Sequence, residues 1–291
     1  MGVRHRLTRL SGSCLAFAVL LTLPVGCGVA SARAGATWSA PPSARSATPS
    51  AAASTLAGRT VGVSGQLSLG PVAGKVIVID PGHNGGNVKQ PRLMASPVPM
   101  GTGDKACDTT GTETNGGYQE AAFTFDVSTR LAALLRAAGA KVIMTRDDDN
   151  GVGPCVDQRA AIGNDNHADV AISIHGDGAP TRDHGFHVLE PARVGAPSNA
   201  IITQSHRLAT LIRDNYRART GIPPANYIGK DGINTRGDMG GLNLSVVPKV
   251  MVECGNMRNA GDAAMMTNAT DRQRMAEGFA AGLAAYLTPA G

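Results

Sequence analysis

The amino-acid sequence predicts a single α/β domain, built from a mostly parallel, twisted β-sheet with helices on both faces. Apolar runs rich in Val and Ile alternate with segments whose apolar residues recur at helical spacing, and this alternation favours parallel strands joined through helices. Residues 76–79 are four β-branched apolar residues in succession, which is typical of a strand buried on both faces. The 291 residues show no internal repeat that would indicate a second module.

Each predicted strand is an apolar run bounded by glycine, proline or polar residues. The predicted strands are 76–79, 141–146, 169–174, 185–190 and 248–253. The predicted helices, which show apolar residues at a period near 3.6, are 123–138, 156–164, 201–216 and 275–287. Two further segments, 84–117 and 222–247, are dense in Gly together with Pro, Thr or Asn, and we predict them to be loops. Loops of this length inside a compact domain are usually functional.

The N-terminal region indicates export. Three arginines within the first nine residues precede a mostly apolar stretch, 10–25, that is too short and too broken for a membrane span. The sequences Ala30-Ser31-Ala32 and Ala32-Arg33-Ala34 both fit a small-x-small cleavage site, and we predict that residues 1–34 are a signal peptide. Cys27 raises the alternative of a lipoprotein, but the segment 24–26 before it is a poor lipidation sequence.

The mature chain is predicted to have one linker and one folded domain. Residues 35–73, rich in Ala, Ser and Pro, are predicted to be a disordered linker, and residues 74–288 the catalytic domain. Four arginines lie in the predicted signal peptide, which leaves 23 basic against 22 acidic residues and no argument for a nucleic-acid partner. No later apolar run could span a bilayer. We therefore expect an exported monomer, secreted or periplasmic, at the cell wall.

Three cysteines remain after the predicted signal peptide. Cys107 and Cys155 both lie among Gly, Asp, Thr and Pro, which indicates surface loops, and an exported chain can keep a disulfide. We predict a Cys107–Cys155 bond and a buried free thiol at Cys254, which follows an apolar run. Three unpaired cysteines are the alternative.

Three predicted strands end next to side chains that can bind a metal. His83 follows the strand 76–79, His175 follows the run 170–174, and Glu253 comes directly after Val252. Because the carboxyl ends of neighbouring parallel strands lie at one edge of a sheet, these groups should converge. Two histidines with carboxylates are a ligand set typical of zinc or another transition metal.

The sequence around these residues resembles that of the zinc-dependent N-acetylmuramoyl-L-alanine amidases. Residues 80–86 resemble the first zinc-ligand motif, Glu120 at a helix start resembles the second ligand, and residues 173–179 resemble the third motif. Residues 248–256 resemble the strand that carries the catalytic glutamate. The motifs occur in family order over about 75–287, and the chain looks like the compact stand-alone type found in mycobacteria.

This resemblance implies a domain of the zinc amidase and carboxypeptidase type with one zinc ion per chain. It assigns His83, Glu120 and His175 as the metal ligands, which leaves a fourth position for water. Glu253 is then the general base, which takes the proton of the attacking water and gives it to the leaving amine. The implied reaction is hydrolysis of the amide between N-acetylmuramic acid and L-alanine in peptidoglycan, during wall turnover, autolysis or cell separation.

The sequence leaves other functions open. One is a zinc carboxypeptidase or aminopeptidase on a related fold, and another is a catalytically silent wall-binding protein. Glu120 also has a simpler explanation, because the helix dipole favours a carboxylate in the first turn. The chain departs from the family motifs at Asn84, which is inserted after His83, and at Gly176 and Gly178, which replace alanines. These changes alter the lining of the site and leave its ligands in place.

Several other polar residues are weaker candidates. Asp80 could orient an imidazole, although turn formation explains it equally well. Arg236 and Asn243 could contact a substrate carboxylate or sugar. The remaining histidines of the domain are predicted to lie away from the site. His184 precedes a strand and His187 lies within it, so neither is at a carboxyl end, and we expect His167 and His206 to be exposed to solvent.

Overall fold

The computed structural model describes residues 67–289, so the predicted signal peptide and most of the predicted linker lie outside the described residues. The first element is a 3-10 helix, η1 (Gly70–Val72), and the side chain of Val72 is fully buried in the core. The packed domain therefore begins a few residues before the boundary at residue 74 that we predicted.

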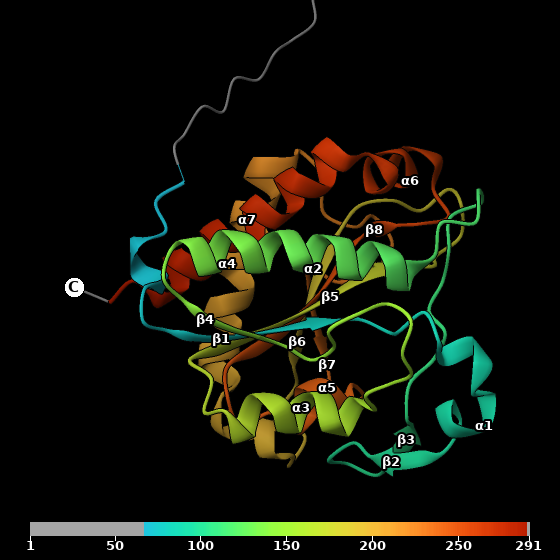
Figure 1. Ribbon diagram of the computed structural model, residues 1–291, viewed down its shortest axis with the longest axis horizontal. Coiled ribbons are helices and arrows are strands. Elements are labelled where there is room, and N and C mark those ends of the chain that lie inside the picture. Colours follow the sequence, from blue (N-terminus) through green and yellow to red (C-terminus); the bar gives the residue numbers. More distant parts are fainter. Residues whose placement is uncertain (1–66, 290–291) are drawn as a thin grey trace, which may run out of the picture. The chain divides into compact units, whose positions relative to one another are not determined.

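The domain is built on a six-stranded sheet with the order β4-β1-β5-β8-β6-β7 (Figure 1). Its strands are β1 (Val76–Pro81), β4 (Lys141–Met144), β5 (Val170–Asp177), β6 (His187–Pro191), β7 (Ile233–Arg236) and β8 (Lys249–Asn256). Strands β4, β1, β5 and β8 are parallel, whereas β6 runs antiparallel to β8 and β7 runs parallel to β6. This confirms the mostly parallel sheet.

Helices cover both faces of the sheet (Figure 1). One face is covered by α2 (Glu120–Ala137), α4 (Ile202–Thr220) and α7 (Ala269–Leu287), and the other by α3 (Val156–Asp165) and the short α5 (Gly240–Asn243). A further helix, α6 (Ala260–Thr267), connects β8 to α7. None of the helices among residues 67–289 combines the length and the apolar character that crossing a membrane requires.

Strand β1 shows why the sequence forms this layered core. Ile77 and Ile79 pack in the large apolar cluster beneath α2, α4 and α7, whereas Val78 packs on the opposite face beside Ile162 of α3. Successive side chains of a strand point to opposite faces, so an uninterrupted apolar run is buried on both sides. The strand ends at Pro81, which directs the chain into the loop that carries His83.

The two segments predicted as loops contain short elements. Residues 84–117 include η2 (Asn87–Lys89), α1 (Pro91–Met94) and a hairpin of β2 (Pro97–Pro99) and β3 (Asp104–Ala106). The segment 222–247 includes β7 and α5. The prediction of structureless loops was wrong here because elements of three or four residues are too short to show a periodic pattern.

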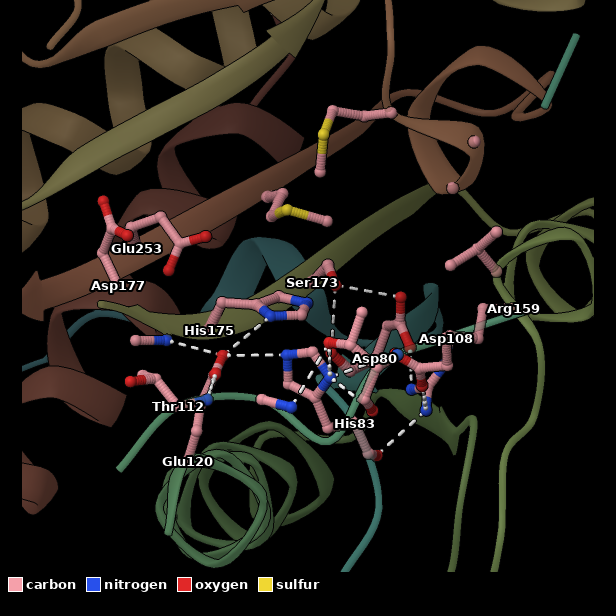
Figure 2. A pocket seen from close by; sticks show the side chains of 18 of the residues that line it. Asp80, His83, Asp108, Thr112, Glu120, Arg159, Ser173, His175, Asp177 and Glu253 are labelled. Atoms are coloured by element: carbon pink, nitrogen blue, oxygen red, sulfur yellow. Dashed lines mark hydrogen bonds and ion pairs between the residues drawn. The ribbon is translucent and has the colours of Figure 1, made fainter. Parts of the chain in front are cut away.

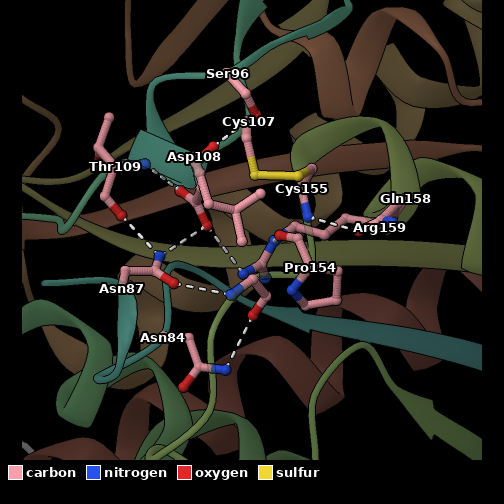
Figure 3. The surroundings of a disulfide bond; sticks show 12 residues. Asn84, Asn87, Ser96, Cys107, Asp108, Thr109, Pro154, Cys155, Gln158 and Arg159 are labelled. Carbon is pink, nitrogen blue, oxygen red and sulfur yellow. Dashed lines mark hydrogen bonds and ion pairs between the residues drawn. A yellow bond between two sulfur atoms is a disulfide. The ribbon is translucent and has the colours of Figure 1, made fainter. Parts of the chain in front are cut away.

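The predicted disulfide is present. Cys107, directly after β3, is bonded to Cys155, the N-cap residue of α3, and Cys254 is a buried free thiol (Figure 3). The backbone N–H of Val156 also donates to the carbonyl oxygen of Cys107 at 2.8 Å. The bond thus ties the β2–β3 hairpin to the start of α3.

Removal of this bond should destabilise the domain. The bond closes a loop with a sequence separation of 48 residues, and loop-closure entropy predicts a stabilisation of about 4 kcal/mol. A Cys107→Ser/Cys155→Ser variant should therefore need less urea for unfolding, and a Cys254→Ser variant serves as the control without a bond. Equal urea midpoints for the double variant and the wild type would contradict this expectation.

Candidate metal centre and active site

The three side chains predicted as metal ligands come together at the edge of the sheet (Figure 2). His83 lies in the loop after β1, Glu120 is the first residue of α2, and His175 lies within β5. Their potential ligand atoms all lie within 4.8 Å of one another. The convergence expected from parallel strands is therefore confirmed, with the helix start of α2 supplying the carboxylate.

Glu120 is held in place by both histidines and by backbone groups. Its Oε1 atom lies 3.2 Å from Nε2 of His83 and 3.0 Å from Nδ1 of His175, and it accepts a hydrogen bond from the N–H of Gly176. Its Oε2 atom accepts a hydrogen bond from the N–H of Thr112 at 2.9 Å. Burial opposes ionisation of this carboxylate, but His83 and His175 outweigh burial and hold the pKa of Glu120 below its usual range.

His83 is oriented by a carboxylate that the sequence did not single out. Its Nδ1 atom lies 3.0 Å from Oδ1 of Asp108, which leaves Nε2 facing Glu120. His83 has φ +56°, a left-handed conformation that is uncommon outside glycine and that aims the ring into the site. A carboxylate on the far nitrogen is the usual arrangement for a metal-binding histidine, because it fixes the tautomer and the ring orientation.

A buried ionic network that includes Asp80, Asp108 and Arg159 lies beside His83 (Figure 2). Asp80 binds Nη1 of Arg159 at 2.8 Å and Nζ of Lys249 at 3.1 Å, and these two cations hold its pKa well below the usual range despite burial. Arg159 also donates to Oδ2 of Asp108 at 3.1 Å and to the carbonyl oxygen of His83 at 2.9 Å. Asp80 therefore supports the site through Arg159 and Asp108 rather than by holding an imidazole itself.

The donor set fits a catalytic zinc ion. Two imidazole nitrogens and one carboxylate oxygen are a common set for catalytic zinc, which keeps a fourth position for water or substrate. Without a metal, Glu120 and Asp108 outweigh the effect of burial and raise the pKa of His83 to about 10. The same two carboxylates would favour a bound cation.

Metal affinity should therefore increase with pH. A metal ion that binds Nε2 of His83 must displace a proton below pH 10, so the proton competes with the metal. The apparent dissociation constant for zinc should fall by about tenfold for each pH unit between about pH 6 and pH 8. Competition with a chromogenic chelator at several pH values measures this dependence, and a pH-independent constant would contradict it.

Glu253 lies beside the three ligands in the wall of a pocket of about 330 Å³. It is in β8, and its backbone is in register with that of His175 in the neighbouring β5. Burial, together with the charges of Glu120 and Asp177, raises the pKa of the Glu253 carboxyl well above its usual range. A cation in the metal site would lower this pKa again, because an opposite charge favours the carboxylate.

The rest of the pocket is largely apolar on the side away from Glu120. Its wall there includes Val156 of α3, Met251 of β8, and Met239 next to α5, while Lys105 of β3 lies at the hairpin side. The Nζ atom of Lys105 donates to the carbonyl oxygen of Asp238 at 3.3 Å. Both segments that we predicted to be functional loops thus contribute to the pocket.

The weaker candidates have other positions. Arg236 forms an ion pair with Asp238, and the side-chain amide of Asn243 donates to the carbonyl oxygen of Gly237. His206 binds Glu190 on the surface, at 2.8 Å. None of these three residues lines the pocket around the metal centre among residues 67–289.

His187 is closer to the site than we predicted. Because β6 runs antiparallel to β8, the beginning of β6 lies at the edge where the other strands end, and His187 is in register with Glu253. The prediction assumed that a histidine at the start of a strand lies at the far edge. That assumption was wrong for β6, which runs antiparallel to β8 in the described sheet.

The fold and the cluster define an α/β protein with a candidate metal centre at the carboxyl edge of its parallel strands. The model of the family described as N-acetylmuramoyl-L-alanine amidase matches residues 77–285. The chain therefore belongs to the N-acetylmuramoyl-L-alanine amidase family, and it is an enzyme that acts on peptidoglycan.

Individual relatives agree with this assignment. The chain is 43% identical over 222 residues to N-acetylmuramoyl-L-alanine amidase Rv3717 of Mycobacterium tuberculosis, which covers 76% of this chain and 89% of the relative. The crystal structure of the amidase Ami1 from Mycobacterium smegmatis is also 43% identical, with a TM-score of 0.70, over 74% of this chain and 98% of that chain. AmiC2 of Nostoc punctiforme, 22% identical over 74% of this chain and 98% of that chain, has the same fold with a TM-score of 0.56.

Proposed function

We propose that this enzyme is an exported, monomeric, zinc-dependent amidase that cleaves the bond between N-acetylmuramic acid and L-alanine during wall turnover, autolysis or cell separation. The observation that carries the proposal is the cluster of His83, Glu120 and His175 with Glu253 beside it in one pocket. The family membership supports the choice of this amide over an ordinary peptide bond.

Each residue of the cluster has a distinct proposed role. His83, Glu120 and His175 would hold one zinc ion. When bound, zinc would supply a Lewis acid that polarises the amide carbonyl and lowers the pKa of water to about 7. Asp108 keeps His83 in the tautomer whose Nε2 is free to bind, since Nδ1–H donates to the Asp108 carboxylate.

Glu253 is proposed to move the proton. Its carboxylate would accept a proton from the attacking water and then deliver it to the nitrogen of the alanine, which leaves as an amine. Its place in the pocket wall beside the ligand cluster suits both transfers. Burial and the charges of Glu120 and Asp177 raise the pKa of this carboxyl, and a cation in the neighbouring metal site would lower it again, so the group would be able both to accept and to return a proton.

The pocket also suits the two sides of the substrate. The wall formed by Val156, Met239 and Met251 offers apolar contacts to small alkyl groups, such as the methyl groups of the lactyl moiety and of alanine. The segments 84–117 and 222–247 both contribute residues to the pocket wall, and a site bordered by such segments would admit a branched polymer. The predicted signal peptide would bring the enzyme to the wall.

Digestion of purified peptidoglycan tests the proposed reaction. The zinc-loaded enzyme should release peptides with a free N-terminal alanine and should create no new reducing sugar ends. Treatment with a chelator should abolish the release, and added zinc should restore it. Release of a C-terminal amino acid from an intact sugar–peptide linkage would instead indicate a carboxypeptidase, and binding to the wall without any cleavage would indicate a silent wall-binding protein.

A further inference from the structure

Among the buried polar atoms of residues 67–289 that have no hydrogen-bond partner, two lie on the adjacent strands β6 and β8 at the active-site edge. They are Nδ1 of His187 and Oε2 of Glu253. Buried polar groups in native proteins are nearly always hydrogen-bonded, so each exception requires an explanation. Glu253 has one explanation in the proton transfer proposed above, whereas His187 has none.

The sheet places these two residues opposite each other. His187 of β6 is the register partner of Glu253 of β8 in an antiparallel pair. Side chains of directly opposite residues project from the same face, with Cβ atoms about 4.5–5.5 Å apart. Two side chains at this Cβ spacing can both reach one water molecule between them, and a buried water needs at least two such polar partners.

Three polar side chains near His187 already have hydrogen-bond partners. Asp177 accepts hydrogen bonds from the Tyr227 hydroxyl at 2.7 Å and from the Gly178 N–H at 2.6 Å, one on each carboxylate oxygen. Arg236 donates to both oxygens of Asp238. Tyr227 presents its ring to His187 in an edge-on contact, 6.1 Å between centroids. Oε2 of Glu253 is the unpartnered acceptor that the strand register places directly opposite His187.

The charge state of His187 suits this role. Burial lowers the pKa of His187 to about 4, with Arg236 acting in the same direction and Asp177 opposing it. At neutral pH the ring is then uncharged, with one N–H donor and one acceptor nitrogen. A neutral donor can orient a carboxylate without adding a second positive charge next to a metal ion.

We propose that His187 is a positioning residue, whose Nδ1–H holds the carboxylate of Glu253 toward the metal centre through one bridging water. The water donates to Oε2 of Glu253 and accepts from Nδ1 of His187. This proposal rests on the role of Glu253 as general base. It implies that His187 affects turnover only through Glu253, and that substrate binding and metal content do not depend on it.

A double-mutant cycle tests the proposal with the zinc-loaded enzyme. His187→Leu should lower kcat by about 10–100-fold, the usual range for residues that orient a metal-site group, with KM and zinc content unchanged. In a Glu253→Gln background the same substitution should change kcat little, because the base it positions is absent. The proposal would be overturned if His187→Leu lowered kcat by the same factor in the wild-type and Glu253→Gln backgrounds. A wild-type kcat for His187→Leu would also overturn it.

Two isosteric variants keep the test independent of packing. His187→Asn places an amide N–H close to the position of Nδ1, whereas His187→Gln places it close to Nε2. The asparagine variant should retain most of the activity and the glutamine variant should lose it, and equal activities would overturn the assignment of Nδ1. His184→Leu, a neighbouring histidine outside the pocket, is the control and should keep wild-type kinetics.

Ring ¹⁵N chemical shifts give a readout that does not depend on catalysis. His187 should be found as the Nδ1–H tautomer in the zinc-loaded wild type, with its signals identified by their loss in His187→Asn. An Nε2–H tautomer would overturn the proposal. A different result would reject the role of Glu253 as general base: a wild-type kcat for the Glu253→Gln single variant.

Discussion

Glu253→Gln should reduce kcat by about 10²–10⁴-fold, the usual contribution of a general acid–base residue. The amide has nearly the same shape as the carboxylate but cannot take up a proton at neutral pH. KM, zinc content and the thermal unfolding temperature should stay close to wild type, because Glu253 is not one of the three clustered ligands. Steady-state kinetics on a soluble muropeptide measure the effect.

A matched control separates this effect from a general loss of carboxylates. Glu277→Gln changes the same residue type on α7, where Glu277 forms an ion pair with Arg219 away from the pocket. This control should keep full activity. Wild-type turnover by Glu253→Gln would assign the base to another residue.

His83→Ala and His175→Ala should each lose metal and activity together. Substitution of residues that only orient ligands costs about 10–100-fold in metal affinity or activity, and loss of a ligand itself should exceed that range. The reason is that Glu120 and a single histidine leave only two of the three clustered ligands. Zinc content after dialysis and the rate of peptide release measure the two losses in parallel.

His206→Ala is the control for a histidine in an ion pair with a carboxylate outside the cluster. It should keep both zinc and activity. Full zinc occupancy in either His83→Ala or His175→Ala would remove that residue from the ligand set.

The layers of the fold could be predicted from the sequence because long apolar runs carry a strong signal. The run at Val76–Ile79 identifies a strand buried on both faces, and the periodic apolar residues of α2 and α7 identify long helices. Strand β7 could not be predicted, since Ile233 is its one apolar residue in the sequence Ile-Asn-Thr-Arg. This strand forms because it pairs with β6, and the local sequence has no apolar alternation that would indicate it.

His83, His175 and Glu253 could be predicted because each follows or ends an apolar run, whereas Glu120, at the start of α2, was predicted from the family resemblance. Asp108 and Arg159 could not, because a polar residue in a loop and an arginine in a helix carry no sign of a distant partner. They meet through tertiary contacts that link β1, the hairpin and α3. The nearby Cys107–Cys155 bond was the available signal, since it fixes the residue next to Asp108 to the helix of Arg159.

Predicting that His187 lies near the site would have required knowing the direction of β6. Alternating strands and helices predict parallel neighbours, and a histidine at the start of a parallel strand lies at the edge opposite the site. The segment between β5 and β6 contains no helix among the described residues, and a connection without a crossover helix permits an antiparallel partner. That missing helix is the feature of the sequence that could have indicated the antiparallel strand.

Metal analysis of the purified enzyme tests the central claim most directly. The account predicts one zinc ion per chain, loss of peptide release when a chelator removes that ion, and recovery of activity when one equivalent of zinc is returned. An enzyme that stays fully active after its zinc content has fallen to zero would contradict it.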